Sequence, residues 1–96
     1  MIVLITYDLK QPGRNYTDLY EAIKSLGDWQ HPLESTWFVH LPDNSNLDEI
    51  VEKLKASADK NDFFFAVEIT KRYQGWLPKS FWTWINQINN KLIKQW

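Results

Sequence analysis

Apolar residues follow two different spacings along the chain, and the alternation of these spacings predicts both strands and helices. Residues 2–7 form a continuous apolar and β-branched run, which is typical of a strand buried on both faces. Residues 35–41 and 63–69 predict two further strands because they are rich in β-branched and aromatic side chains. Pro32 cannot donate a backbone hydrogen bond, so residues 29–33 are expected to form only a short strand at a sheet edge.

Two other segments carry the spacing of three and four residues that is typical of an amphipathic helix. Asn15 is expected to cap the first helix and Gly27 to end it, and Asn46 with Glu49 forms a capping box at the start of the second. The apolar stripes consist of Tyr16, Leu19, Tyr20, Ile23 and Leu26 in the first helix and of Leu47, Ile50, Val51, Leu54 and Ala58 in the second.

The order of these elements predicts one α+β domain over residues 1–96. Residues 1–70 are expected to form a βαββαβ core, and residues 71–96 a connector followed by an aromatic-rich C-terminal helix that begins after Pro78. This order is typical of the ferredoxin-like arrangement, a four-stranded antiparallel sheet with two helices on one face. Right-handed crossovers would place the first and third strands in the middle of the sheet.

Aromatic residues make up 16% of the chain and include six Trp. Large rings fill a core or mark an interface, and Trp76, Trp82 and Trp96 are the candidates for interface residues. A chain of this length buries a limited core, so a homodimer is expected to add to its stability. The absence of cysteine excludes disulfides, thiolate zinc sites and cysteine nucleophiles.

Charge is distributed unevenly, although the formal net charge is only −1. Residues 1–68 contain all twelve Asp and Glu and six Lys and Arg, whereas residues 69–96 contain five Lys and Arg and no acid. A basic end on an acidic body predicts binding of a polyanion such as DNA or RNA, or of the acidic part of a second copy. The alternative is a solvated basic surface without a partner.

Several classes of protein have no support in the sequence. The N-terminal apolar run has no preceding positive region and is too short to span a membrane, so a cytoplasmic protein without membrane contact is expected. Ser35 is not part of a nucleophile elbow, and no glycine-rich phosphate loop occurs. His31 and His40 lie on different predicted strands without the spacing of metal ligands.

Asp8 is the candidate for a catalytic and metal-binding residue, because it ends a predicted central strand beside a Gly-containing loop. Two copies of this carboxylate across a dimer axis could hold one Mg²⁺, which binds a few carboxylate oxygens together with water. Such an ion activates water for phosphodiester cleavage. The alternative is that Asp8 only ends the strand and accepts hydrogen bonds from the loop.

Cationic residues occur in two places where they could contact phosphates. Lys10 and Arg14 follow the first strand, and Lys71 and Arg72 follow the last. Lys71 and Arg72 are close in sequence to Tyr73 and Trp76, and a combination of cations and rings suits phosphate contact with base stacking. The same combination suits a protein interface.

Three short motifs give the chain a resemblance to a known family. With Tyr7-Asp8-Leu9 at the end of the first strand and Glu34-Ser35-Thr36-Trp37-Phe38 at the third, the chain resembles the CRISPR-associated protein 2 superfamily. The chain looks most similar to the short bacterial SinR-like branch of that superfamily, and the similarity extends over most of residues 1–78. The motifs that carry this likeness are Tyr7-Asp8-Leu9, Leu33-Glu34-Ser35-Thr36-Trp37 and Gly75-Trp76-Leu77-Pro78. The resemblance implies a small ferredoxin-like homodimer, as in the related virulence-associated protein D, and assigns the strand-end aspartate of metal-dependent nucleases to Asp8.

The sequence also departs from that family, and three functions therefore compete. Only Lys10 and Arg14 stand where the family has an arginine-rich stretch, and the C-terminus is expected to be helical rather than a strand. The sparse arginines and the acidic body favour a nucleic-acid-binding or scaffolding dimer without strong nuclease activity. The alternatives are a magnesium-dependent endonuclease and a protein-interaction module of a toxin–antitoxin or defence system that docks through its tryptophan-rich helix.

Overall fold

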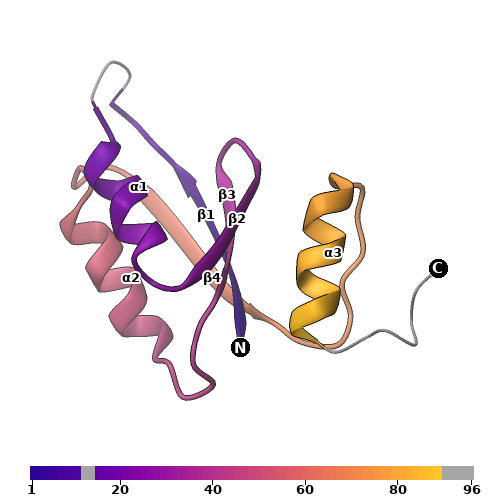
Figure 1. Ribbon diagram of the computed structural model, residues 1–96. Coiled ribbons are helices and arrows are strands. Elements are labelled where there is room, and N and C mark those ends of the chain that lie inside the picture. Colours follow the sequence, from indigo (N-terminus) through magenta and orange to yellow (C-terminus); the bar gives the residue numbers. More distant parts are fainter. Residues whose placement is uncertain (12–14, 90–96) are drawn as a thin grey trace.

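The chain forms an α+β structure in which three helices accompany a four-stranded sheet in the part that the structure describes (Figure 1). The computed structural model describes residues 1–11 and 15–89. The elements are β1 (Ile2–Asp8), α1 (Thr17–Lys24), β2 (Asp28–Leu33), β3 (Thr36–His40), α2 (Leu47–Ala56), β4 (Phe63–Ile69) and α3 (Lys79–Ile88).

The four strands form one antiparallel sheet in the order β2-β3-β1-β4. The α+β class, the antiparallel sheet and the central position of the first and third strands are therefore confirmed. Along β4, the register pairs Asp8 with Phe63 and Ile2 with Ile69, so the end of β1 lies beside the beginning of β4. This register decides which sequence-predicted site residues lie near each other.

Helices cover both faces of the sheet, but to different extents (Figure 1). On one face α1 and α2 pack their apolar stripes onto Val3, Ile5 and Val39, which are fully buried. On the other face α3 packs at the end of the sheet where β1 begins, and its Phe81 and Ile85 are buried against Ile2 and Phe38. The predicted C-terminal helix thus includes a buried part, and its residues 90–96 lie outside the described residues.

The helix ends agree only in part with the predicted caps. Asn46 is the N-cap of α2, and its side chain accepts a hydrogen bond from the Glu49 backbone N–H at 3.2 Å. The prediction that Asn15 is the N-cap of the first helix was wrong by one residue, since the N-cap is Tyr16. Asn15 Oδ1 still accepts a hydrogen bond from the Thr17 backbone N–H at 2.9 Å, so its side chain stabilises the same turn.

Gly27 was expected to end the first helix through its conformational freedom, and this reason was wrong. Helix α1 ends at Lys24 with Ser25 as the C-cap. Gly27 instead lies where the chain passes close to the backbone of β3, because a Cβ atom at this position would be 2.1 Å from the His40 carbonyl oxygen. Glycine is therefore required here by close backbone approach.

The two edge strands of the sheet differ in regularity. Strand β2 contains Pro32, and its pairing with β3 shifts register between Gln30 and Leu33, as expected for the predicted short edge strand. Strand β4 pairs with β1 along its whole length and contains neither proline nor a bulge. In residues 1–11 and 15–89, no helix has the length and apolar character needed to cross a bilayer.

Candidate functional site

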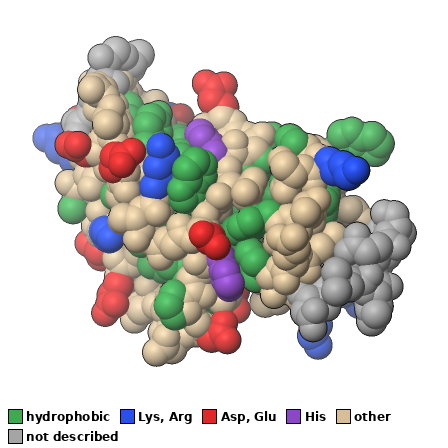
Figure 2. Space-filling view, viewed as in Figure 1, with side chains coloured by type: hydrophobic (Ala, Val, Ile, Leu, Met, Phe, Trp, Pro, Cys, Tyr) green, Lys and Arg blue, Asp and Glu red, His purple; other side chains and the backbone are tan. Residues whose placement is uncertain are grey.

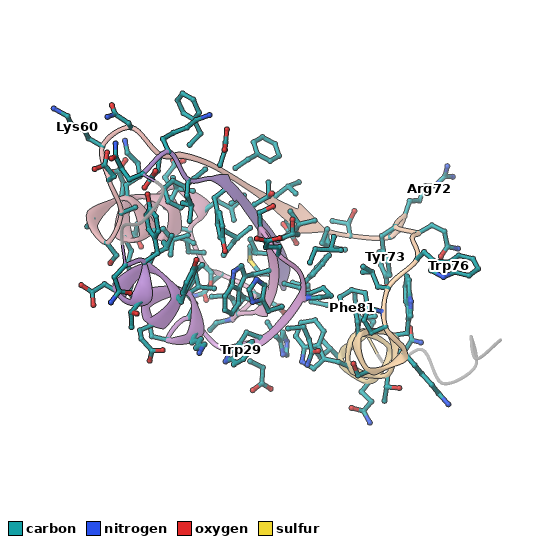
Figure 3. The ribbon with its side chains drawn as sticks, turned by 90° about the horizontal axis from the view of Figure 1, so that it is seen from above. Trp29, Lys60, Arg72, Tyr73, Trp76 and Phe81 are labelled. Carbon is teal, nitrogen blue, oxygen red and sulfur yellow. The ribbon has the colours of Figure 1, made fainter. Side chains whose placement is uncertain are left out.

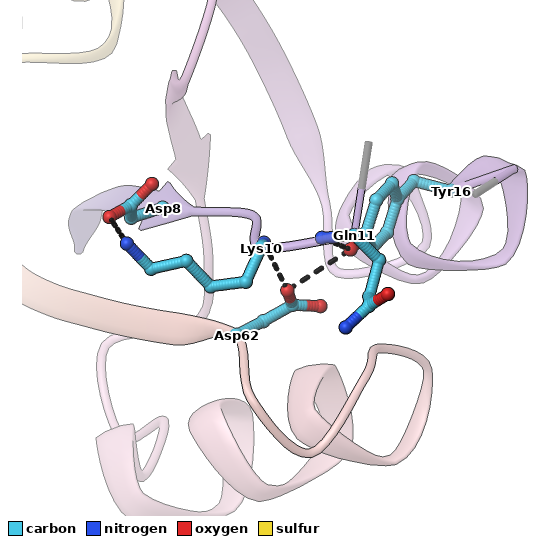
Figure 4. A network of polar contacts seen from close by, with 5 residues as sticks. All are labelled: Asp8, Lys10, Gln11, Tyr16 and Asp62. Carbon is cyan, nitrogen blue, oxygen red and sulfur yellow. Dashed lines mark hydrogen bonds and ion pairs between the residues drawn. The ribbon is translucent and has the colours of Figure 1, made fainter. Parts of the chain in front are cut away.

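Asp8 lies at the exposed end of β1, as the sequence predicts (Figure 4). Its carboxylate accepts a hydrogen bond and forms an ion pair with the Lys10 ammonium two residues later. Lys10 therefore compensates the charge of Asp8 within the same loop. Both side chains are well exposed, and such a pair contributes little to stability.

An open pocket of about 360 Å³ lies beside Asp8. It is lined by Asp8 and by Glu34 and Ser35, which lie in the turn between β2 and β3. Asp8 is distant in sequence from Glu34 and Ser35, and the two groups belong to different motifs of the family resemblance. Two carboxylates and a hydroxyl are oxygen ligands of the kind that Mg²⁺ prefers. Within the described part of the chain, no group of three or more His, Cys, Asp or Glu side chains is placed to hold a metal ion.

Tyr7 forms a wall of this pocket and is held by two hydrogen bonds. The Trp37 indole N–H donates to the Tyr7 hydroxyl at 3.0 Å, and this hydroxyl donates to the Glu34 carbonyl oxygen at 3.3 Å. Burial raises the pKa of Tyr7 above its usual value, so the phenol remains protonated at neutral pH. These bonds connect the core to the turn that carries Glu34 and Ser35, and thus hold one side of the pocket.

Asp62 supports the same loop from below and was missed by the sequence analysis (Figure 4). Its buried carboxylate accepts hydrogen bonds from the Lys10 backbone N–H at 2.7 Å and from the Tyr16 hydroxyl at 3.0 Å. A third donor is the Asp59 backbone N–H at 2.8 Å. Asp62 therefore joins the β1–α1 loop to the turn before β4. Its only signal in the sequence is that an acid directly precedes an apolar strand.

Three large apolar side chains are exposed on β4. Phe63, Phe65 and Val67, called here the β4 face, have exposed fractions of 66%, 63% and 38%. Each is paired in register with a β1 residue of the sheet face opposite α1 and α2. At one end of the β4 face, the Lys10 ammonium lies 5.5 Å from the centre of the Phe63 ring, within the range of a cation–π contact.

Lys71 and Arg72 lie at the other end of the sheet from Asp8. Both are exposed and follow the last residue of β4, whereas Asp8 is level with the first. A strand of seven residues separates these ends by about 20 Å. Figure 3 shows Lys60, which precedes β4, and Arg72, which follows it, at opposite ends of the molecule.

The charge asymmetry of the sequence is also an asymmetry in space. On the face shown in Figure 2, acidic side chains are spread over the sheet and the α1–α2 side, and only basic ones are visible in the part over α3. Of the residues predicted to contact phosphates, Lys10 pairs with Asp8, whereas Lys71 and Arg72 lie at the opposite end of the sheet. Arg14 lies outside the described residues.

The three tryptophans predicted at an interface have different environments. Trp76 is 98% exposed and lies near Arg72 and Tyr73 in the connector (Figure 3). Trp82 is half-buried and packs against Phe81 and Tyr73, with ring centres 5.2 and 6.5 Å apart, so it belongs partly to the core. Trp96 lies outside the described residues.

The two histidines do not form a common site. The His31 ring stacks on Trp37 with ring centres 3.7 Å apart, and its Nε2 atom is 2.9 Å from the Glu34 carbonyl oxygen. His40 is at the end of β3, opposite Asp28 of β2. The contacts of His31 are those of a side chain that packs the β2–β3 hairpin.

Comparison with known proteins yields no assignment, since no protein-family model matches this chain and no curated protein matches it either.

Proposed function

We propose that this chain is a homodimeric, ferredoxin-like protein that binds single-stranded DNA or RNA. The observation that carries the proposal is the β4 face, where two exposed phenylalanines and a valine on an edge strand are followed by exposed Lys71 and Arg72. The order of the elements and the central position of β1 and β3 support the ferredoxin-like part.

Single strands suit this surface better than a duplex does. Exposed aromatic rings on a sheet face stack on unpaired bases, and because every base has a π-face, such stacking tolerates most sequences. Bases in a duplex are stacked on each other and are not available to Phe63 and Phe65. Lys10, at one end of the β4 face, and Lys71 and Arg72, at the other, would contact the phosphates of the same strand.

Fluorescence anisotropy with labelled single-stranded oligonucleotides of DNA and RNA tests this proposal. We expect Phe63→Ala and Phe65→Ala each to weaken binding by about 1–3 kcal/mol, the usual contribution of one stacked base. Trp29→Ala is the matched control, because Trp29 is also an exposed ring but is paired in register with Val39, on the sheet face that α1 and α2 cover. Equal affinities of the three variants and the unchanged protein would contradict the proposal.

The cations are tested by the dependence of binding on salt. Phosphate contacts release counterions, so affinity should fall steeply between about 50 and 200 mM salt. Lys71→Glu and Arg72→Glu should each weaken binding to all sequences alike and reduce the salt slope by about 1. Lys53→Glu on α2 changes the net charge equally, at a distance from the β4 face, and should leave the slope nearly unchanged.

A magnesium-dependent endonuclease is the second candidate, and the pocket shared by Asp8 and Glu34 favours it. The carboxylates of Asp8 and Glu34 would hold the ion, which when bound would activate water for phosphodiester cleavage. The resemblance to the CRISPR-associated protein 2 superfamily supports the same role for Asp8. Asp8→Asn should then abolish magnesium-dependent cleavage and retain binding, and cleavage that survives this substitution would exclude the candidate.

A further inference from the structure

The two edges of the sheet differ in how well they are protected from pairing with another chain. An edge strand presents unpaired backbone N–H and C=O groups, and proteins commonly block it with proline, bulges or charged side chains. Strand β2 has Pro32, an irregular register and Asp28. Strand β4 is a regular seven-residue edge, Phe-Phe-Phe-Ala-Val-Glu-Ile, in which Glu68 is the only charged residue. Its composition is that of a strand with a neighbour on both sides.

We propose that the neighbour is β4 of a second copy, paired antiparallel so that the two sheets become one. This inference rests on the dimer of the proposed function and specifies its geometry. Antiparallel pairing about a two-fold axis reverses one strand relative to the other. It therefore brings the Asp8 end of one copy beside the basic end, Lys71 and Arg72, of the other.

Charge complementarity selects a second copy as the occupant. At the Asp8 end, the described residues include Asp8, Glu34, Asp59 and Asp62 against Lys10 and Lys60, so this end is acidic. Lys71 and Arg72 follow β4 in a segment, residues 69–96, that contains no acid. Because β4 has an acidic end and a basic end, two antiparallel copies of this edge strand place each acidic end beside the basic end of the other copy.

The register follows from the length of β4. Full overlap of two strands Phe63–Ile69 centres the pairing on Ala66, where a small side chain meets its own copy. Phe63 is then opposite the partner's Ile69, and Asn61 is opposite the partner's Lys71. Asp8 is one strand further away, about 10 Å from the partner's Ile69, compared with about 20 Å from its own.

Two functional consequences follow from this pairing. The β4 faces of the two copies become adjacent and form one aromatic surface in the middle of a continuous sheet. The Asp8 pocket of each copy gains Lys71 and Arg72 of the partner subunit as phosphate contacts in addition to its own Lys10. The site is therefore composite, and neither copy contains all of it.

Engineered cysteines test the pairing, because the natural chain has none. In the variant Asn61→Cys/Lys71→Cys, the two exposed positions lie beyond the two ends of β4 and are more than about 20 Å apart within one chain. A short thiol cross-linker can therefore join them only between copies. We expect a closed, covalent dimer from the double variant, and no cross-linking from Asn61→Cys or Lys71→Cys alone. Asp28→Cys on the β2 edge is a further control and should remain uncross-linked.

The outcomes separate this inference from the proposed function. A protein that is dimeric by light scattering but gives no cross-linked double variant has another dimer geometry, which overturns the inference. A ladder of higher oligomers also overturns it, since the two-fold pairing closes at two copies. A protein that is monomeric at all concentrations also overturns the inference. Oligonucleotide binding by the unchanged protein is measured separately, so its absence in a cross-linkable protein would refute the proposed function alone.

Discussion

Asp62 is a buried carboxylate that depends on three donors from different parts of the chain. The Lys10 and Asp59 backbone N–H groups and the Tyr16 hydroxyl all donate to it. We expect Asp62→Ala to lower the free energy of unfolding by about 3 kcal/mol, because each lost bond to a charged group leaves a partly buried donor unpaired. Urea denaturation measures this change. Asp48→Ala on α2 removes an exposed acid and should cost much less, and equal losses in both variants would contradict the structural role of Asp62.

Gly27 and Gly75 form a natural pair for testing close backbone approach. A methyl group at Gly27 would collide with the His40 carbonyl oxygen, whereas nothing lies within 4 Å of a Cβ atom at Gly75. Gly27→Ala should therefore lower the free energy of unfolding by about 1–3 kcal/mol, the usual cost of overpacking. Gly75→Ala should have almost no effect. Thermal denaturation followed by circular dichroism distinguishes the two, and a neutral Gly27→Ala would show that the hairpin adjusts freely.

The candidate site was predictable only where a local pattern marks it. Asp8 could be placed because the apolar run of β1 ends there. Glu34 was named only as part of a motif of the family resemblance, and its position in the pocket comes from the structure. Asp62 could not be found, since its partners Lys10 and Tyr16 are 52 and 46 residues away and no periodicity links them. The separation of Lys71 and Arg72 from Asp8 follows from the antiparallel orientation of β4 and β1, because antiparallel neighbours end at opposite edges of the sheet.

At the scale of elements, α3 is the segment whose role the apolar pattern left open between core and docking surface. The structure shows that Phe81 and Ile85 are buried against the sheet and that the Phe81 and Phe38 rings are 4.6 Å apart. The exposed surface of this region is instead in the connector, at Trp76. The apolar spacing of α3 predicts an amphipathic helix. It does not predict which surface covers the apolar side, because that depends on contacts with residues distant in sequence.

Phe81→Ala should therefore lower the free energy of unfolding by about 3–5 kcal/mol, the usual cost of removing a buried ring. Trp76→Ala, which removes a larger but fully exposed ring, should change it by less than about 0.5 kcal/mol. Chemical denaturation followed by circular dichroism compares them. If Phe81→Ala were as mild as Trp76→Ala, α3 would not be an integral part of the fold.

Most of the elements themselves were predictable, and the reasons differ between them. Strand β4 has the predicted bounds because its β-branched and aromatic run is enclosed by polar residues. The end of α1 was harder to predict, because Gly27 lies in neither a left-handed turn nor the helix cap. It instead lies against the backbone of His40. The irregular register of β2 beyond Gln30 was indicated by Pro32, although its exact position was not.

At the scale of the whole molecule, the proposed dimer predicts that stability depends on protein concentration. When two copies bind in the folded state only, mass action raises the melting temperature as the concentration increases. Calorimetry over two decades of concentration measures this rise. Phe65→Glu should abolish the dependence, because it places a charge in the middle of the exposed strand without disturbing a buried residue. A melting temperature independent of concentration in the unchanged protein would argue for a monomer.

The pairing of β1 with β4 also constrains how the chain folds during its synthesis. Strand β1 is made first, yet one of its two neighbours in the sheet begins at Phe63, more than half of the chain later. Closing so long a loop is slow compared with forming the local β2–β3 hairpin, and it must wait for the ribosome to release β4. Until then one of the most apolar segments of the nascent chain stays without its final partner. A chaperone that binds the emerging polypeptide would therefore be expected to act on residues 2–7.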